Sequence, residues 1–502
     1  MRLIFSSVIF LSILFISIIS IKNGFFFDDE IFNIRTVSSY NYSGLWNYIN
    51  TEDVHPPVHY IINKAAFDLF GSWEAVKVLG AILNALGLAI FGFIAFDKID
   101  PRARLSLGIL LALCGTTIMW GASLRWYAYF NPLFAVILGI ILFSDLSLTR
   151  RTLILAAGIV LLFYVNYETL CAAPVLVAAH LLRERKNFRR SDIIILLVAG
   201  VAGFALCLPQ LLVFIEYARG HGANQTASFL SALSQIAITL VVGNAVFPLS
   251  VAAGVYAALI AALGVYFLFV KPKSDIDWIV LIGLTLGTLL MVVTGIAMKP
   301  RNSVFLLPLV FLIIASAVAA LPPLWARAAI ALIAAFQLLG AVNVAWHRDT
   351  LKGSFNIDYR GSLATITAWK DQCKGKLIVF NHDSPLNYLL EENSIGSSSV
   401  FSPQRGTDIA AHPGDCVVLT KTYAGTLNGD EVATLYRMLD NPALKQVAVK
   451  QLSEDRYAAI KSWVGKEPFP QYSIEFVEYD VTSDVTLPAW TGAIKRLDEG
   501  QD

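Results

Sequence analysis

The feature that most constrains this sequence is a series of apolar runs, most of them long enough to cross a lipid bilayer. A transmembrane helix needs about 20 predominantly apolar residues. The chain is 56% hydrophobic and only 15% charged, whereas soluble domains are about 25% charged. The pattern predicts a polytopic α-helical membrane protein with about 11 transmembrane helices, the first of them retained rather than cleaved. The runs are 3–21, 76–96, 105–120, 126–144, 152–166, 169–182, 192–215, 249–270, 276–298, 303–320 and 326–346.

Basic residues are concentrated in alternate connections between these runs, and such connections are cytoplasmic in membrane proteins. This predicts that the loop 23–75 and all residues after 346 are external. Residues 229–248 are apolar with several polar positions, and we expect an external amphipathic or re-entrant segment there, because polar groups at membrane depth need a protein- or water-lined cavity. The basic residues are Arg2, Lys98, Arg102, Arg104, Arg150, Arg151, Arg183, Arg185, Lys186, Arg189, Arg190, Lys271, Lys273 and Arg327.

The composition changes after residue 346, where the apolar runs shorten to the length of strands. Strand-like and helix-like segments alternate, which predicts an extracytoplasmic α/β domain over 347–502 with a largely parallel sheet, following a membrane domain over 1–346. Cys373 and Cys416 lie in this domain, and the sequence does not decide whether they form a disulfide. The strand-like segments are 376–381, 399–402, 416–420 and 446–449, and the helix-like ones are 363–370, 386–392 and 431–439.

Two polar motifs share the first external loop. Asp28, Asp29 and Glu30 follow three phenylalanines directly after the first apolar run. A carboxylate at a membrane surface can accept a proton from a hydroxyl or hold a divalent cation, although acidic patches there are commonly just solvated. In an extended loop, adjacent side chains point in opposite directions, so only one of the two aspartates readily faces the second motif.

The second motif is His55-Pro56-Pro57-Val58-His59-Tyr60. Its simplest interpretation is a proline-stiffened turn before the second apolar run. The two prolines disfavour a helical two-histidine metal site. We assign no cofactor, and we leave open a divalent metal ion bound by Asp29, Glu30 and His55.

Cationic side chains stand at the expected external ends of later runs. Arg125, Lys299 and Arg301 could bind a phosphate there, although each taken alone is also typical of a side chain that reaches the membrane interface. Tyr127 belongs to the aromatic group beside Arg125, and Glu168 lies at another external end as a candidate contact to an acceptor substrate.

Taken together and in this order, the motifs resemble the GT-C glycosyltransferases, within them the branch of aminoarabinose transferases and protein O-mannosyltransferases. Asn302 stands where family members often carry tyrosine, and residues after 346 are not covered by the resemblance. The matching residues are Asp29-Glu30, the His55–Tyr60 motif, Arg125-Trp126-Tyr127, and Lys299-Pro300-Arg301-Asn302 followed by Pro308.

The resemblance implies a bacterial inner-membrane enzyme that moves a sugar from a polyprenyl-phosphate donor to an external glycan, lipid or protein acceptor. It implies Asp29 as general base, with Glu30 and His55 orienting the acceptor or holding a cation. Asp28, His59 and Tyr60 are further candidate substrate contacts, and the cations would stabilise the departing phosphate. Two alternatives stay open, a flippase or transporter of lipid-linked sugar and a membrane assembly protein. A net charge of +1 gives no indication of a nucleic-acid partner.

Overall fold

The computed structural model describes residues 2–53, 55–185, 190–220, 229–294, 300–351, 353–380, 384–393, 400–401, 409–422, 441–453 and 474–487. The chain forms two compact units. The transmembrane unit comprises residues 1–23 and 33–350, and the C-terminal unit comprises 24–32 and 351–502. The boundary expected after residue 346 thus falls after residue 350. In addition, the segment 24–32, expected within the membrane domain, groups with the C-terminal unit.

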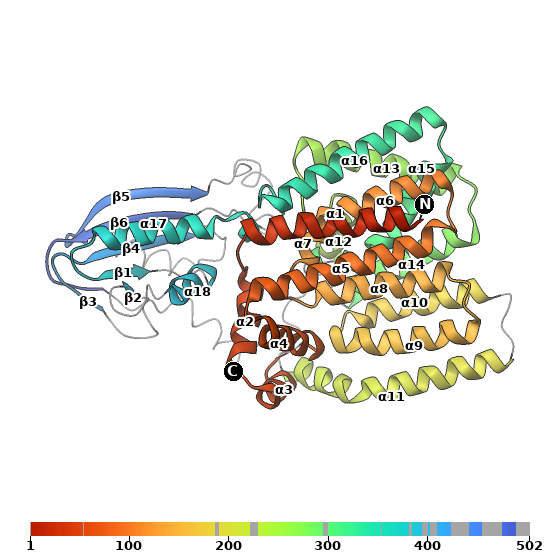
Figure 1. Cartoon of the computed structure of the whole chain (residues 1–502), viewed down its shortest axis with the longest axis horizontal. Helices are drawn as coiled ribbons and strands as arrows, with labels where there is room; N and C mark the ends of the chain where they lie inside the picture. The colour runs from red at the N-terminus through yellow and green to blue at the C-terminus, as the bar shows by residue number, and fades with distance from the viewer. Residues whose placement is uncertain are drawn as a thin grey trace. The chain divides into compact units, whose positions relative to one another are not determined.

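The transmembrane unit is a bundle of helices, in which α1, α5 and α8 pack side by side (Figure 1). Its helices are α1 (Arg2–Asn23), α3 (Tyr42–Thr51), α4 (Val58–Phe70), α5 (Trp73–Phe96), α6 (Pro101–Leu113), α7 (Gly115–Gly121), α8 (Tyr127–Phe143), α9 (Leu148–Val165), α10 (Thr169–Glu184), α11 (Arg190–Gly220), α12 (Phe229–Val241), α13 (Val251–Val265), the π-helix η1 (Tyr266–Val270), α14 (Asp275–Val293), the 3₁₀-helix η3 (Pro300–Leu306), α15 (Leu307–Ala320) and α16 (Pro323–Ala345). Helix α2 (Asp28–Ser39) begins in the C-terminal unit and ends in the transmembrane unit.

Among the described residues, eight helices are long and apolar enough to cross a membrane, and the bent pair α6–α7 would make a ninth. The expected number of about 11 is therefore too high by this criterion. The runs 126–144 and 169–182 are helical, as α8 and α10, but these helices have only 17 and 16 residues. Each begins after a non-helical segment that holds a predicted site residue, Arg125 or Glu168. The protein is an integral, multi-pass membrane protein.

Close packing of α5 on α8 depends on Gly87. A Cβ at this position would lie 2.3 Å from the Cβ of Pro132 in α8, well inside van der Waals contact, so any larger residue would push the two helices apart. Small residues at helix contacts are typical of membrane bundles, because they let two backbones approach closely. This contact helps to place α8, which follows Arg125 directly.

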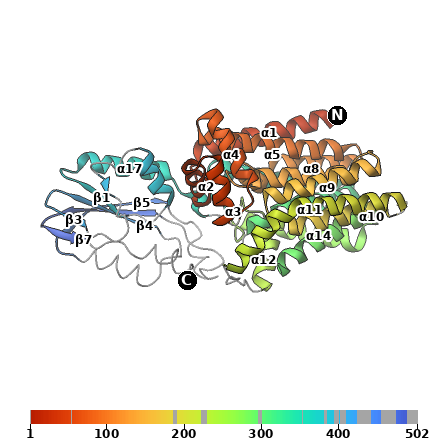
Figure 2. The same ribbon diagram turned by 90° about the horizontal axis from the view of Figure 1, so that it is seen from below.

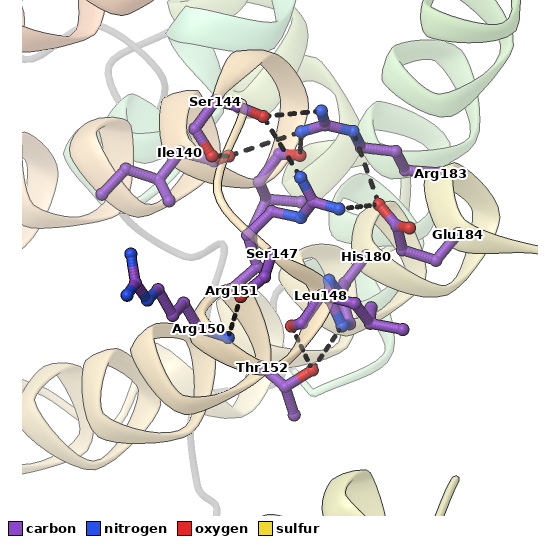
Figure 3. Close-up of polar contacts among 11 residues, drawn as sticks. Ile140, Ser144, Ser147, Leu148, Arg150, Arg151, Thr152, His180, Arg183 and Glu184 are labelled. Carbon is purple, nitrogen blue, oxygen red and sulfur yellow. Dashed lines mark hydrogen bonds and ion pairs between the residues drawn. The ribbon is translucent and has the colours of Figure 1, made fainter. Parts of the chain in front are cut away.

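The opposite end of α8 is held by two arginines (Figure 3). Arg183 donates from Nη2 to the carbonyl of Ser144 at 2.8 Å, and Arg151 donates to the same carbonyl from Nη1 at 3.2 Å. Buried Glu184 accepts from Nη2 of Arg151 at 2.5 Å and lies 3.6 Å from Nε of Arg183. The cluster supplies donors to the C-terminal carbonyls of α8, which lack partners within the helix, and it joins α8 to α9 and α10.

The segment expected not to span the membrane forms α12, which has 13 residues and is too short to cross it. The chain after α12 is irregular but hydrogen-bonded. Gly243 adopts a φ of 82°, in the left-handed region that favours glycine. The N–H of Asn244 donates to Oγ1 of Thr116 at 2.7 Å, and Asn343 donates to the carbonyl of Ala245 at 3.0 Å. Non-helical backbone inside the bundle is thus satisfied by protein groups, as such depth requires.

The C-terminal unit contains a five-stranded sheet with the order β2-β1-β4-β6-β5. Strands β2, β1 and β4 are parallel, whereas β6 is antiparallel to both β4 and β5. The expectation of a largely parallel sheet was therefore wrong for half of its pairings. The elements are η4 (Gly353–Asn356), α17 (Tyr359–Gln372), β1 (Leu377–Phe380), α18 (Ser384–Glu392), β2 (Val400–Phe401), β3 (Ile409–Ala411), β4 (Cys416–Thr422), β5 (Leu444–Ser453), β6 (Ile474–Val481) and β7 (Val485–Leu487). The helix expected over 431–439 lies outside the described residues.

Alternation along β1 separates two apolar layers. Leu377 and Val379 face α17 and α18, which cover one side of the sheet (Figure 2). Ile378 and Phe380 face the other side, where the antiparallel pair β3–β7 packs. A disulfide joins Cys373, at the end of α17, to Cys416 at the start of β4, with a Cα–Cα distance of 5.9 Å. It fixes α17 to the sheet, and disulfides are typical of oxidising compartments.

Candidate functional site

The acidic motif forms the first turn of α2 and not an extended loop. Glu30 is buried, and its Oε2 accepts a hydrogen bond from the N–H of Phe27 at 3.2 Å. This is one half of a capping box, in which the third helical residue reaches back to the residue before the helix. Carboxylates in a first turn are also stabilised by the helix dipole. Glu30 therefore has a structural role at the start of α2, in addition to the catalytic role predicted for it.

The His-Pro-Pro turn is held by Asp53, which the sequence analysis did not single out. Asp53 Oδ1 lies 2.9 Å from Nδ1 of His55 and accepts from its backbone N–H at 3.1 Å. The hydroxyl of Tyr60, on the first turn of α4, donates to Oδ2 of the same carboxylate. Burial alone would raise the pKa of Asp53, but the hydrogen bonds from His55 and Tyr60 and the charge of Arg125 hold it well below its usual value. Asp53 is therefore an ionised acceptor at neutral pH.

Arg125 completes this chain of contacts. Its Nη2 lies 3.1 Å from Nε2 of His55, and a guanidinium has only donors. Nε2 must therefore accept, which leaves the proton on Nδ1, where it points to Asp53. The order Tyr60–Asp53–His55–Arg125 fixes both the tautomer of the imidazole and the position of one edge of a guanidinium that is 5% exposed.

A second buried network of hydrogen bonds connects the elements that carry Tyr60 and Arg125. The side-chain amide of Asn63, on α4, donates to Oδ1 of Asn33 at 3.0 Å and to the carbonyl of Leu124 at 2.8 Å. The hydroxyl of Tyr129 donates to Oδ1 of Asn63 at 2.6 Å. Asn63 thus joins the end of α2, helix α4 and the segment that carries Arg125.

Arg301, the second predicted phosphate-binding cation, lies against two aromatic rings. Its guanidinium carbon is 5.7 Å from the ring centroid of Trp120 and 5.8 Å from that of Tyr127. These are cation–π distances, and the rings hold the planar guanidinium in place. Tyr127 follows Arg125 by two residues in the chain.

Glu168 lies between α9 and α10 and is 3% exposed. Among the described residues, none hydrogen-bonds to its Oε2. Burial raises the pKa of Glu168 well above its usual value, and the positive charge of Arg301 opposes this increase. A protonated carboxyl can donate a hydrogen bond, which suits recognition of a sugar hydroxyl or a phosphate oxygen.

The structure places most of the predicted residues of the transmembrane unit in these clusters. His55, Tyr60 and Arg125 belong to the cluster around Asp53. Tyr127 and Glu168 belong to the cluster around Arg301. His59 is fully buried, with its ring centroid 4.0 Å from that of Tyr60. Lys299 and the side chain of Asp28 lie outside the described residues.

The residues that the sequence analysis missed are Asp53 and Trp120. Asp53 carried a signal, because an aspartate two residues before a histidine is typical of a turn in which the carboxylate accepts the backbone N–H.

A metal site remains a prediction. Within the part of the chain that the structure describes, no group of three or more His, Cys, Asp or Glu side chains is arranged to hold a metal ion. The ligand set named from the sequence, Asp29, Glu30 and His55, belongs to two different units of the chain.

Comparison with solved structures identifies the fold. The chain is similar to ArnT from Cupriavidus metallidurans in the apo state, with a TM-score of 0.50, 13% identity, and coverage of 94% of this chain and 97% of that one. It is also similar to the same protein bound to undecaprenyl phosphate, with a TM-score of 0.50, 12% identity and the same coverage. The arabinofuranosyltransferase AftD from mycobacteria matches with a TM-score of 0.46 and 16% identity over 96% of this chain and 40% of that one.

The sequence matches no protein-family model and no curated protein sequence. The similarity to ArnT therefore concerns the fold alone. The resemblance inferred from the motifs is confirmed at this level.

Proposed function

We propose that this protein is a glycosyltransferase that takes a sugar from a polyprenyl-phosphate donor and transfers it to an acceptor on the external face of a bacterial inner membrane. The observation that carries the proposal is that two guanidinium groups are each held in place by neighbouring side chains. Arg125 is positioned by a hydrogen-bonded histidine, and Arg301 is positioned by two aromatic rings. Guanidinium groups bind phosphate through paired, charge-assisted hydrogen bonds.

These cations suit the leaving group of the reaction. When the bond between the anomeric carbon and the phosphate oxygen breaks, negative charge increases on the lipid phosphate. Fixed donors that meet this charge lower the barrier, because they need no reorganisation during the reaction. Lys299 would add a third cation from the same stretch of sequence as Arg301. The ArnT structure with undecaprenyl phosphate shows that a protein of this fold binds such a lipid.

The acceptor would be activated by Asp29. Its carboxylate takes the proton of an acceptor hydroxyl, the oxygen attacks the anomeric carbon, and polyprenyl phosphate departs with the bonding electron pair. One displacement inverts the anomeric centre. Asp29 is favoured over Asp28 by its position in the Asp-Glu motif and over Glu30 by the capping role of that residue. The sugar and the acceptor, whether glycan, lipid or protein, are open.

The test is consumption of a radiolabelled polyprenyl-phosphate sugar by the purified protein, with a panel of acceptors. We expect label to pass to an acceptor while polyprenyl phosphate is released in equal amount. Movement of intact donor across proteoliposomes, with no release of polyprenyl phosphate, would contradict the proposal and favour a transporter.

A further inference from the structure

The aromatic residues before the acidic motif pack into the core of the C-terminal unit. The ring centroid of Phe25 lies 6.1 Å from that of Tyr359 on α17 and 6.3 Å from that of Tyr388 on α18. The ring of Phe26 meets that of Tyr388 edge-on, at 6.3 Å and 89°. Phe25 also packs against the buried cluster between the helices and the sheet. A segment from the start of the chain is therefore anchored in a unit formed by its last third.

The segment that carries these two rings directly precedes the first turn of α2. Phe27 follows the anchored rings, and its N–H and carbonyl begin the helix through Glu30 and Ile31. Asp29 is only four residues after Phe25, and four residues span at most about 14 Å in an extended chain. With so short a connection, movement of the anchored rings must move the start of the helix.

The helices that these rings contact are tied to the rest of the C-terminal unit. Tyr359 is buried at the start of α17, and the other end of that helix is bonded through Cys373 to the sheet. Leu389, on α18 next to Tyr388, belongs to the same buried cluster. The rings of Phe25 and Phe26 thus rest on helices that have little freedom to shift.

We propose that the C-terminal unit is a positioning element for the acidic motif, and that Tyr388 and Tyr359 are positioning residues that act through Phe25 and Phe26 on Asp29. The kinetic consequence rests on the proposed function, whereas the anchoring itself does not. Tyr388 makes two ring contacts with the segment, and the loss of both corresponds to roughly a 5- to 100-fold change in the balance between held and released segment.

A spin label at position 29 of the full-length protein tests the anchoring without any assay of activity. We expect Tyr388→Ala to increase the mobility of the label, and Tyr388→Phe, which keeps the ring, to leave it as in the unsubstituted chain. Leu389→Ala is the matched control, because it removes a buried side chain from the same helix but no ring that contacts the segment. Unchanged mobility in Tyr388→Ala, or an equal increase in Leu389→Ala, would overturn the proposal.

A kinetic arm on the chain with Asp29 intact separates this proposal from the proposed function. Tyr388→Ala should lower kcat about tenfold, with little change in KM for the donor, because a misplaced base slows the chemical step and leaves phosphate binding intact. Tyr388→Phe should restore kcat. Increased label mobility in Tyr388→Ala without glycosyl transfer by any variant would support the anchor and refute the enzyme. An active Tyr388→Ala variant with unchanged kcat would refute the positioning role.

Discussion

Replacing Asp53 with Asn tests whether the His-Pro-Pro turn serves to hold Arg125. The carboxylate accepts from Nδ1 and from the backbone N–H of His55, and from the hydroxyl of Tyr60. Asn keeps the shape but has a single acceptor oxygen, and its amide N–H would face a donor. At least one charge-assisted hydrogen bond is lost and one buried donor is left without a partner, at a cost of about 2–4 kcal/mol.

Part of this cost should appear in use of the donor. Without the carboxylate, His55 loses its charged acceptor at Nδ1, which favours the tautomer with the proton on Nε2, where it would face Arg125 donor to donor. We expect kcat/KM for the polyprenyl-phosphate donor to fall about 10- to 100-fold. Thermal unfolding in detergent should show a lower Tm. The pKa of Asp53 is depressed, so its contribution to stability is present above the ordinary pKa and is lost only in strong acid. The difference in Tm should thus be constant from about pH 5 to pH 8.

The matched control is Asp68→Asn on the outer surface of α4. Asp68 is about half exposed, lies 3.7 Å from Nζ of Lys64, and accepts from the hydroxyl of Tyr42. The substitution removes one negative charge from α4, the helix that follows Asp53, at a cost of about 1 kcal/mol or less. Equal kcat/KM and equal Tm in Asp53→Asn and Asp68→Asn would refute the reasoning, because the buried chain to Arg125 would then have no consequence.

Three further predictions concern other parts of the account. Arg301→Ala should weaken use of the donor and Arg301→Lys should recover only part, because lysine offers a point charge and no fork; equal KM values in all three proteins would leave Arg301 an interfacial side chain. Glu168→Gln should raise Tm more at pH 8 than at pH 5. Burial raises the pKa of this carboxyl, so the stability of the unsubstituted protein falls as the pH rises above about 4.5. Equal shifts in Tm at both pH values would contradict this. Cys373→Ser with Cys416→Ser should cost the C-terminal unit about 4 kcal/mol for a bridge across 43 residues, seen as a lower Tm that reductant no longer changes; wild-type stability would show that the bridge does not form.

The helical runs could be predicted because hydrophobicity determines which segments enter a bilayer. Their lengths were harder to predict. The runs 126–144 and 169–182 form helices of only 17 and 16 residues, α8 and α10, which an apolar count takes for full spans. The patterns predicted the positions of β1, β2, β4 and part of β5, but not β3, β7 or β6, which pairs antiparallel with β4 and β5. Pairing depends on contacts between distant segments.

At the candidate site, the sequence indicated charged and aromatic residues whose motifs stand out, namely His55, Tyr60, Arg125 and Arg301. It missed Asp53, whose significance depends on which donors the fold brings to it. Glu30 was predicted from its neighbour Asp29, and only the geometry of α2 shows its capping hydrogen bond. The grouping of Phe25 with the C-terminal unit is likewise a tertiary fact. Local patterns indicated the candidate groups, and the three-dimensional structure shows which residues contact them.

The most direct measurement of the central claim is the rate of sugar transfer by Asp29→Asn and Asp28→Asn under saturating donor. Both variants remove one charge from the first turn of α2. We predict that Asp29→Asn lowers the rate roughly 10²- to 10⁴-fold with little change in donor binding, because the amide cannot accept the proton, and that Asp28→Asn costs much less. Normal turnover by Asp29→Asn would contradict the account. If Asp28→Asn were the inactive variant instead, the base would be the neighbouring carboxylate, and if both were active, the acidic motif would have no part in catalysis.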